Sequence, residues 1–316
     1  MTHQHDGSRI RSHIMVVLAT LIWGFNNIAM KIAYREIDPW MFNGIRLAAV
    51  LPFVLIAARR MPGYRPFLFR DLLHIAGIAL IGFTGFQLLF PLGVHGVSAP
   101  VSGIMVATMP VWVVLINRIA KTDTVTPLAF AGVLVTMAGI IIISVFSGGN
   151  GTADGGTTLK GILFITLAEL FFAVNTVFLR PYMRRYSVAQ VTSVAVVMAV
   201  MLFGALLNRR FLTFDYAGLS LITWAMMLFS GIIGLFLANL LWNSSIRRIG
   251  STRVAVYGNL PPVFVLLFGA LVLGEVLVGL QIAAAVIIVS GVVLVQVHDA
   301  GMIDQFVKRA MRRIDR

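Results

Sequence analysis

The sequence predicts an all-α integral membrane protein with ten transmembrane helices, arranged as two inverted five-helix repeats. Three observations predict this fold: an apolar composition, ten apolar segments of membrane-spanning length, and an uneven distribution of basic residues. Of the 316 residues, 59% are hydrophobic and 12% are charged, whereas a soluble domain has roughly 25% charged residues. Because this few charged residues cannot cover a water-facing surface, most apolar side chains must face lipid.

A helix needs about 20 apolar residues to cross the hydrocarbon of a bilayer. Charged residues and Gly/Pro-rich runs divide the chain into segments of that length. We expect transmembrane helices at residues 14–33, 39–58, 72–92, 98–117, 125–146, 159–179, 188–207, 219–241, 253–273 and 278–297. The first segment is too long for the core of a signal peptide, and no small-residue cleavage site follows it, so we expect it to be retained.

These segments divide the chain into an N-terminal repeat (1–147), a Gly-rich linker (148–158), a C-terminal repeat (159–297) and a basic tail (298–316). In the tail, apolar residues recur at helical spacing and basic residues occupy the other face. This pattern predicts an amphipathic helix lying on an anionic cytoplasmic membrane surface. The alternative is a frayed, charged tail.

Basic residues fall mainly on one side of the predicted membrane. With the N-terminus inside and the spans alternating, 19 Lys and Arg residues lie on the inner side and five on the outer side. Because cytoplasmic loops are rich in Lys and Arg, we expect a multi-pass protein of the cell inner (cytoplasmic) membrane with both termini cytoplasmic. The net charge of +13 is also typical of nucleic-acid binding, but no long soluble segment could hold a nucleic acid, and we expect no such partner.

The two halves of the chain repeat each other. A shift of 152 residues places 109–112 over 261–264, and a shift of 149 places 23–26 over 172–175. Five spans is an odd number, so the second half must enter the membrane from the opposite side. Inverted repeats of this kind are typical of secondary transporters, although channels also contain internal repeats.

Several short motifs occur in order along both halves: Trp23-Gly24 with a following Asn, Arg46, Pro110 and Pro262, Gly274-Glu275, Ala138-Gly139 and Ser290-Gly291. With its two five-span halves, the chain resembles the drug/metabolite transporter (DMT) superfamily, in particular its EamA-type members, and among these the exporters of aromatic amino acids. The resemblance implies a central cavity lined by spans one, three, four, six, eight and nine. It also implies small metabolites, often amino acids, as exported substrates. Thr122-Asp123 departs from the Gly-Glu pair of the second half, which puts a role of the acidic pair in the first half in doubt.

Glu169 and Arg46 lie inside predicted spans, where a charge is costly and is expected to face protein or water. Glu169, near the centre of the sixth span, is either a proton-coupling site or a partner for a substrate ammonium group. The alternative is a neutral carboxyl group hydrogen-bonded to another helix. Arg46 either holds a substrate carboxylate, or snorkels to the outer interface, or caps a helix end.

Amides and indoles share helix faces. Asn239, Trp242 and Asn243 lie on one face of the eighth span, as Trp23 and its neighbouring amides do in the first. Amide donors beside an indole suit an uncharged or zwitterionic metabolite with an apolar body, although hydrogen bonding between helices also explains them. We predict that the following residues line the substrate cavity: Trp23, Asn26, Asn27, Gln87, Met105, Trp112, Glu169, Phe172, Asn175, Asn239, Trp242, Asn243 and Tyr257.

Pro110 and Pro262 are expected in the middle of the fourth and ninth spans, where each would remove a backbone hydrogen bond and kink the helix. Such a kink either pivots as a gate or is a fixed bend set by packing. We predict a gating role, because the two prolines occupy equivalent places in the two halves.

These patterns together predict a secondary transporter that moves small organic metabolites by alternating access, with export of amino acids, aromatic ones first, as the leading expectation. The alternatives are an ion channel or pore, an intramembrane enzyme, or a lipid flippase-like protein. The sequence contains no Cys, no Gly-x-x-x-x-Gly-Lys-Ser/Thr loop and no His-Glu-x-x-His motif, so we expect no enzyme activity, no metal site and no cofactor. Its expected partners are a small-molecule substrate and the lipid bilayer, and it is expected to be a monomer or a homodimer.

Overall fold

The computed structural model describes residues 2–122 except Ser98 and Ala107, residues 158–273, and eight single residues beyond these (131, 134, 279, 282, 283, 286, 287 and 290). Within this part of the chain the secondary structure is helical, and no strand occurs. Seven helical segments there are long and apolar enough to cross a membrane: Ile10–Ala33, Pro39–Arg60, Phe69–His95, Leu159–Arg185, Val188–Thr213, Leu221–Ile249 and Ser251–Val272. The all-α class and these seven spans agree with the sequence prediction.

The structure describes only parts of the remaining predicted regions. The fifth and tenth predicted spans, the linker up to residue 157 and the tail at 298–316 lie outside the described residues, apart from the single positions named above. The total of ten helices therefore stays a prediction.

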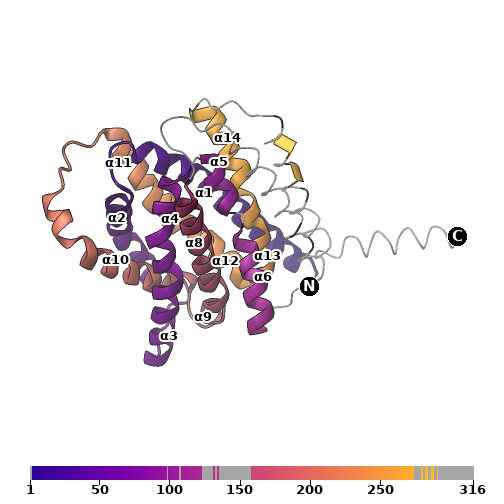
Figure 1. Cartoon of the computed structure of the whole chain (residues 1–316). Helices are drawn as coiled ribbons and strands as arrows, with labels where there is room; N and C mark the ends of the chain where they lie inside the picture. The colour runs from indigo at the N-terminus through magenta and orange to yellow at the C-terminus, as the bar shows by residue number, and fades with distance from the viewer. Residues whose placement is uncertain are drawn as a thin grey trace.

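The spans are composed of shorter elements, shown in Figure 1. In chain order these are α1 (Thr2–Ala33), α2 (Pro39–Arg60), α3 (Phe69–Ala79), η1 (Leu80–Thr84), α4 (Gly85–His95), α5 (Ala99–Val106), α6 (Met109–Ala120), α8 (Leu159–Phe178), α9 (Arg180–Arg185), α10 (Val188–Thr213), α11 (Leu221–Leu228), η2 (Phe229–Leu237), α12 (Ala238–Ile249), α13 (Ser251–Val256), η3 (Tyr257–Asn259) and α14 (Pro261–Leu273).

Local capping residues fix where several of these helices begin. The side chain of Asp38 accepts hydrogen bonds from the backbone N–H groups of Trp40 and Met41, and Pro39 occupies the first turn of α2. The pre-set φ angle of proline and a carboxylate cap both favour a helix start. Ser187 and Gln190 form a capping box at the start of α10.

The fourth predicted span is not one continuous helix, which corrects the sequence prediction. It is divided into α5 and α6, and Pro110 lies in the first turn of α6 rather than in a helix interior. Both the N–H and the hydroxyl group of Thr108 donate to the carbonyl of Met105 and end the preceding helix. Pro262 likewise lies in the first turn of α14, directly after the 3₁₀ turn η3. A proline in a first turn removes no helical hydrogen bond, so both prolines begin new helices instead of kinking existing ones.

The third and eighth spans each contain a π-helical segment in their middle, η1 and η2. At both segments a glycine allows a close approach of a helix from the other half. A Cβ atom at Gly82 of η1 would lie 2.8 Å from the backbone nitrogen of Asn175, and one at Gly234 of η2 would lie 2.6 Å from Oδ1 of Asn26. π-helical turns are rare and concentrate at functional sites.

The helices pass back and forth between two ends of a bundle (Figure 1). At the first end, where α1 begins, His13 contacts Tyr257 and Asn117 donates to Ser251 and Thr252. At the second end, the Lys31 ammonium donates to the carbonyl of Val97. Here also Thr158, which begins α8, donates through its N–H to the carbonyl of Gly96, and Arg210 pairs with Asp38 at 2.6 Å. Consequently α1 begins at the first end, whereas α8 begins at the second.

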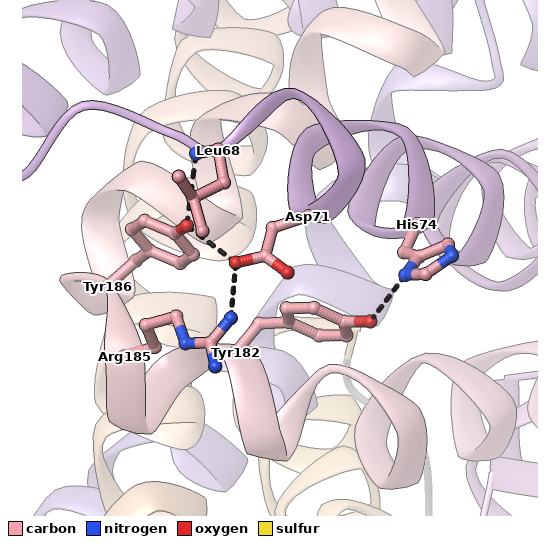
Figure 2. A network of polar contacts seen from close by, with 6 residues as sticks. All are labelled: Leu68, Asp71, His74, Tyr182, Arg185 and Tyr186. Carbon is pink, nitrogen blue, oxygen red and sulfur yellow. Dashed lines mark hydrogen bonds and ion pairs between the residues drawn. The ribbon is translucent and has the colours of Figure 1, made fainter.

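Polar residues join α3 to the segment around α9 at the first end, as Figure 2 shows. The carboxylate of Asp71 accepts hydrogen bonds from the Arg185 guanidinium and the Tyr186 hydroxyl, each at 2.6 Å. The Tyr186 oxygen in turn accepts from the backbone N–H of Leu68 at 3.1 Å. We call Asp71, Arg185 and Tyr186 the α3–α9 clamp, because they tie the first half of the chain to the second.

Candidate functional site

A cavity lies in the interior of the bundle, between elements of both halves. It encloses about 650 Å³ of empty space, its open side included. Its walls come from α1, α2, η1, α4, α5 and α6 of the first half, and from α8, η2, α12, η3 and α14 of the second. The lining residues are Trp23, Asn26, Asn27, Arg46, Phe83, Phe86, Gln87, Phe90, Val106, Met109, Glu169, Phe172, Gly234, Leu235, Asn239, Gly258 and Pro261.

Aromatic rings form much of the apolar wall. Phe86 and Phe90 stack with their centroids 4.6 Å apart, and Phe86 contacts Phe172 at 5.1 Å. Trp23 meets Phe172 edge-on at 5.6 Å. The Trp23 indole N–H donates to the carbonyl of Gly234 in η2 at 3.0 Å, which fixes the ring against the cavity. Such a wall suits an apolar or aromatic body of a ligand.

Arg46 contributes a buried cation to this wall. Only 3% of the residue is exposed. Its guanidinium donates to Oδ1 of Asn43, to Oε1 of Gln87 at 2.8 Å and to Oγ of Ser230 at 2.7 Å. Every one of these acceptors is neutral, and within the described ranges no carboxylate forms an ion pair with Arg46. Of the alternatives raised by the sequence, an interfacial or helix-capping position is therefore excluded, because this side chain points into the bundle.

Glu169 brings a carboxyl group into the same cavity. It lies near the middle of α8 and is 2% exposed. No residue that the structure describes donates a hydrogen bond to it or pairs with it. A buried polar group normally has a hydrogen-bond partner, so this carboxyl group is available to a ligand, to water or to a proton.

Three amides complete the polar part of the wall, and the structure shows one contact from the side-chain nitrogen of each. Asn27 donates to the Trp23 carbonyl at 3.1 Å, and Asn239 donates to the Leu235 carbonyl at 2.6 Å. Asn26 makes only a weak contact with the sulfur of Met30. The Oδ1 atoms of Asn26 and Asn27 are buried and have no hydrogen-bond partner among the described residues.

The structure brings together some of the residues predicted for the cavity and not others. Seven of them line it: Trp23, Asn26, Asn27, Gln87, Glu169, Phe172 and Asn239. The other six do not belong to its wall: Met105, Trp112, Asn175, Trp242, Asn243 and Tyr257. A role of any of these residues in substrate binding remains a prediction.

Several of the six residues have identifiable packing roles. Trp242 is fully buried directly behind Trp23, with ring centroids 4.9 Å apart. Asn243 donates to the hydroxyl group of Thr192 at 3.2 Å, which joins α12 to α10. Asn175 is the residue that approaches Gly82. Met105 and Trp112 are partly buried and pack against the hydrophobic core.

The sequence analysis did not identify three phenylalanines of the wall, Phe83, Phe86 and Phe90. Their spacing of three and four residues places them on one helical face together with Gln87, and this shared face could have identified them. Pro261 was also missed, although the neighbouring Pro262 was singled out as a hinge.

Comparisons with known proteins identify related membrane transporters. A model of the family described as EamA-like transporters matches residues 10–145 and 159–297. A "Probable amino-acid metabolite efflux pump" of Salmonella typhimurium is 24% identical over 88% of this chain and 92% of its own length. An "Uncharacterized transporter" of Archaeoglobus fulgidus is 23% identical over 90% of this chain and 99% of its own. A solved crystal structure with 16% identity superposes with a TM-score of 0.70 over 90% of this chain and 97% of that chain.

Proposed function

Because this chain belongs to the EamA-like transporter family, we propose that it is a secondary transporter that exports an amino acid or a related small metabolite by alternating access. Its place would be the cytoplasmic membrane, with the first end of the bundle facing the cytoplasm. That orientation follows the predicted excess of basic residues on the inner side. The family itself and the multi-pass apolar helices make the protein a membrane transporter.

The observation that carries the substrate class is the composition of the cavity. An apolar wall with stacked aromatic rings lies beside a guanidinium, a carboxyl group and amides in one cavity. A small amphipathic metabolite satisfies both parts of such a wall. The similarity to the "Probable amino-acid metabolite efflux pump" of Salmonella typhimurium supports the same class for this chain.

The arrangement of the two halves supports alternating access. α1 and α8 begin at opposite ends of the bundle, as inverted repeats require. In addition, the shifts of 149 and 152 residues that relate the halves also relate two contacts. Gly82 of η1 contacts Asn175 of α8, and the equivalent Gly234 of η2 contacts Asn26 of α1. A pair of equivalent contacts allows the two halves to exchange conformations, which would turn the cavity from one side of the membrane to the other.

Transport in proteoliposomes tests the proposal. Vesicles preloaded with an unlabelled amino acid should exchange it for labelled L-phenylalanine, L-tryptophan or L-leucine faster than protein-free vesicles do, and with saturation. If no amino acid or other small metabolite of a broad panel is exchanged, or if the protein instead carries ionic current, the proposal is wrong.

A matched pair of variants links transport to the cavity. Val106 lines the cavity, whereas Leu167 is 44% exposed on the outside of α8. Val106→Trp fills the cavity and should lower exchange at least about tenfold, since a substrate that cannot bind gains no transport. Leu167→Trp adds the same ring on the surface and should leave exchange unchanged.

A further inference from the structure

A guanidinium and a carboxyl group line the cavity without contacting each other. Arg46 comes from α2 and Glu169 from α8, so the two groups belong to different halves of the chain. Both residues are almost completely buried, at 3% and 2% exposure. The structure nevertheless shows no ion pair between them in the described part of the chain, where Arg185–Asp71 and Arg210–Asp38 are the pairs that form.

The guanidinium of Arg46 is positioned, and its charge is not neutralised. It has five N–H donors, and its hydrogen-bond contacts are with Asn43, Gln87, Ser230 and, at 3.9 Å, the weakly accepting sulfur of Met30. The guanidinium also lies 5.5 Å from the centre of the Phe42 ring. The three amide and hydroxyl acceptors hold the planar group in place. The weak sulfur contact and the remaining donor leave room for a carboxylate. A buried cation is costly without a counter-ion, and a planar guanidinium is suited to carboxylates.

The carboxyl group of Glu169 has the complementary requirement. It has no donor among the described residues and lies on the same wall as Phe172, one helical turn away. An ammonium group supplies three donors and a positive charge. The ring of Phe172, with Phe86 beside it, would then lie next to the apolar part of the same ligand.

We propose that Arg46 and Glu169 form a two-point receptor for a zwitterion, in which Arg46 binds the carboxylate and Glu169 the ammonium group of an α-amino acid. This inference rests on the proposed function and adds to it the requirement that the ligand carry both a carboxylate and an ammonium group. The side chain of the ligand lies against Phe86 and Phe172. A ligand with both charges neutralises both buried groups at once, and one that lacks either charge leaves the opposite group buried and unpaired.

Binding to the purified, full-length protein in detergent tests the inference, because the uncharged forms of simple amines and acids cross lipid unaided and would obscure transport. The probes are L-phenylalanine, 2-phenylethylamine, which lacks the carboxylate, and 3-phenylpropionate, which lacks the ammonium group. We expect L-phenylalanine to bind at least about tenfold more tightly than either analogue, the effect of one charge-assisted hydrogen bond. Equal binding of all three overturns the inference.

Two variants assign each charge to its residue. Arg46→Gln should abolish the preference for L-phenylalanine over 2-phenylethylamine and keep its preference over 3-phenylpropionate. Glu169→Gln should do the reverse. If the residue has only a structural role, its substitution lowers the affinity for all three ligands by the same factor, and that result overturns the assignment. If Arg46→Gln does not fold, Arg46→Lys keeps the charge and should keep the preference with weaker binding, because lysine lacks the planar fork.

Glu36→Gln is the matched control, since Glu36 lies in an exposed turn between α1 and α2 and outside the cavity. It should leave all three affinities unchanged. If none of the three probes binds, the zwitterion receptor is refuted, whereas the proposed transport of another metabolite survives. If L-phenylalanine binds with the expected preference and no exchange occurs in proteoliposomes, the receptor survives and the proposed function fails.

Discussion

Cutting the α3–α9 clamp should change which end of the cavity is accessible. Asp71 receives two hydrogen bonds that connect the halves of the chain, and Asp71→Ala removes both. The bond from Tyr186 is buried and made to a charged group, so its loss costs about 1.5–3 kcal/mol. The Arg185 side chain is 58% exposed, so its ion pair adds about 0–1 kcal/mol. The two losses together are about 1.5–4 kcal/mol, and each 1.4 kcal/mol is a factor of ten, so the conformer ratio should shift roughly 10- to 700-fold toward opening at the first end.

The assay uses the absence of native cysteine from the sequence. Met109→Cys places one reporter in the cavity wall, where the native side chain is 2% exposed. A membrane-impermeant maleimide, applied from the side of the first end, then measures how often the cavity opens there. In the Asp71→Ala background the labelling rate should rise by the factor calculated above.

Arg210→Gln is the control at the opposite end, because it breaks the pair with Asp38 at the second end. It should not raise the labelling rate from the first end, and it should raise the labelling rate from the second end. The reasoning is refuted if Asp71→Ala lowers the thermal stability of the protein and leaves labelling from both sides unchanged. The clamp would then be a structural contact that does not break during transport.

Three further changes have defined outcomes. Gly82→Ala and Gly234→Ala should each lower the free energy of unfolding by about 1–3 kcal/mol through overpacking, measured by thermal or denaturant unfolding. Gly77→Ala should not, because no atom lies within 4 Å of the added Cβ, and an equal loss at Gly77 would contradict the packing argument. Trp23→Phe removes the indole donor to the Gly234 carbonyl and should cost about 1 kcal/mol; unchanged stability would show that this bond contributes nothing net. Glu169→Gln should abolish the pH dependence of transport if that carboxyl group carries a proton, and an unchanged pH profile of exchange would retire the coupling role.

The membrane spans could be predicted because their determinants are local. Apolar length and flanking charge mark each span in the sequence, and Asp38 with Pro39 fixes the start of α2 to the residue. The division of the fourth span at Thr108 was not predictable to this precision. A proline in a long apolar run is compatible with a kinked helix and with a new helix, and the surrounding packing decides between them.

The sequence predicted a cavity with polar and aromatic lining, but it identified only some of the lining residues. Trp23 and its amides could be found because polar groups within an apolar helix must face protein or a cavity. Phe83, Phe86 and Phe90 could have been found only through the helical face that they share with Gln87, because an apolar side chain alone does not distinguish a cavity wall from a lipid-facing surface. Arg46 lies close enough to the end of its span that the sequence allowed it to face the cavity, the membrane interface or a helix end. Its burial depends on acceptors from Gln87 and Ser230, which lie far away in the sequence.

The π-helical segments η1 and η2 change the direction in which the side chains that follow them point around the helix axis. A π turn contains an additional residue, so the helix beyond it is rotated by about 100° relative to an uninterrupted α-helix. Gln87 lies beyond η1 and Asn239 beyond η2, and both line the cavity. Removing one residue from either segment would rotate the helix that follows by about 100° and would therefore turn Gln87 or Asn239 away from the cavity.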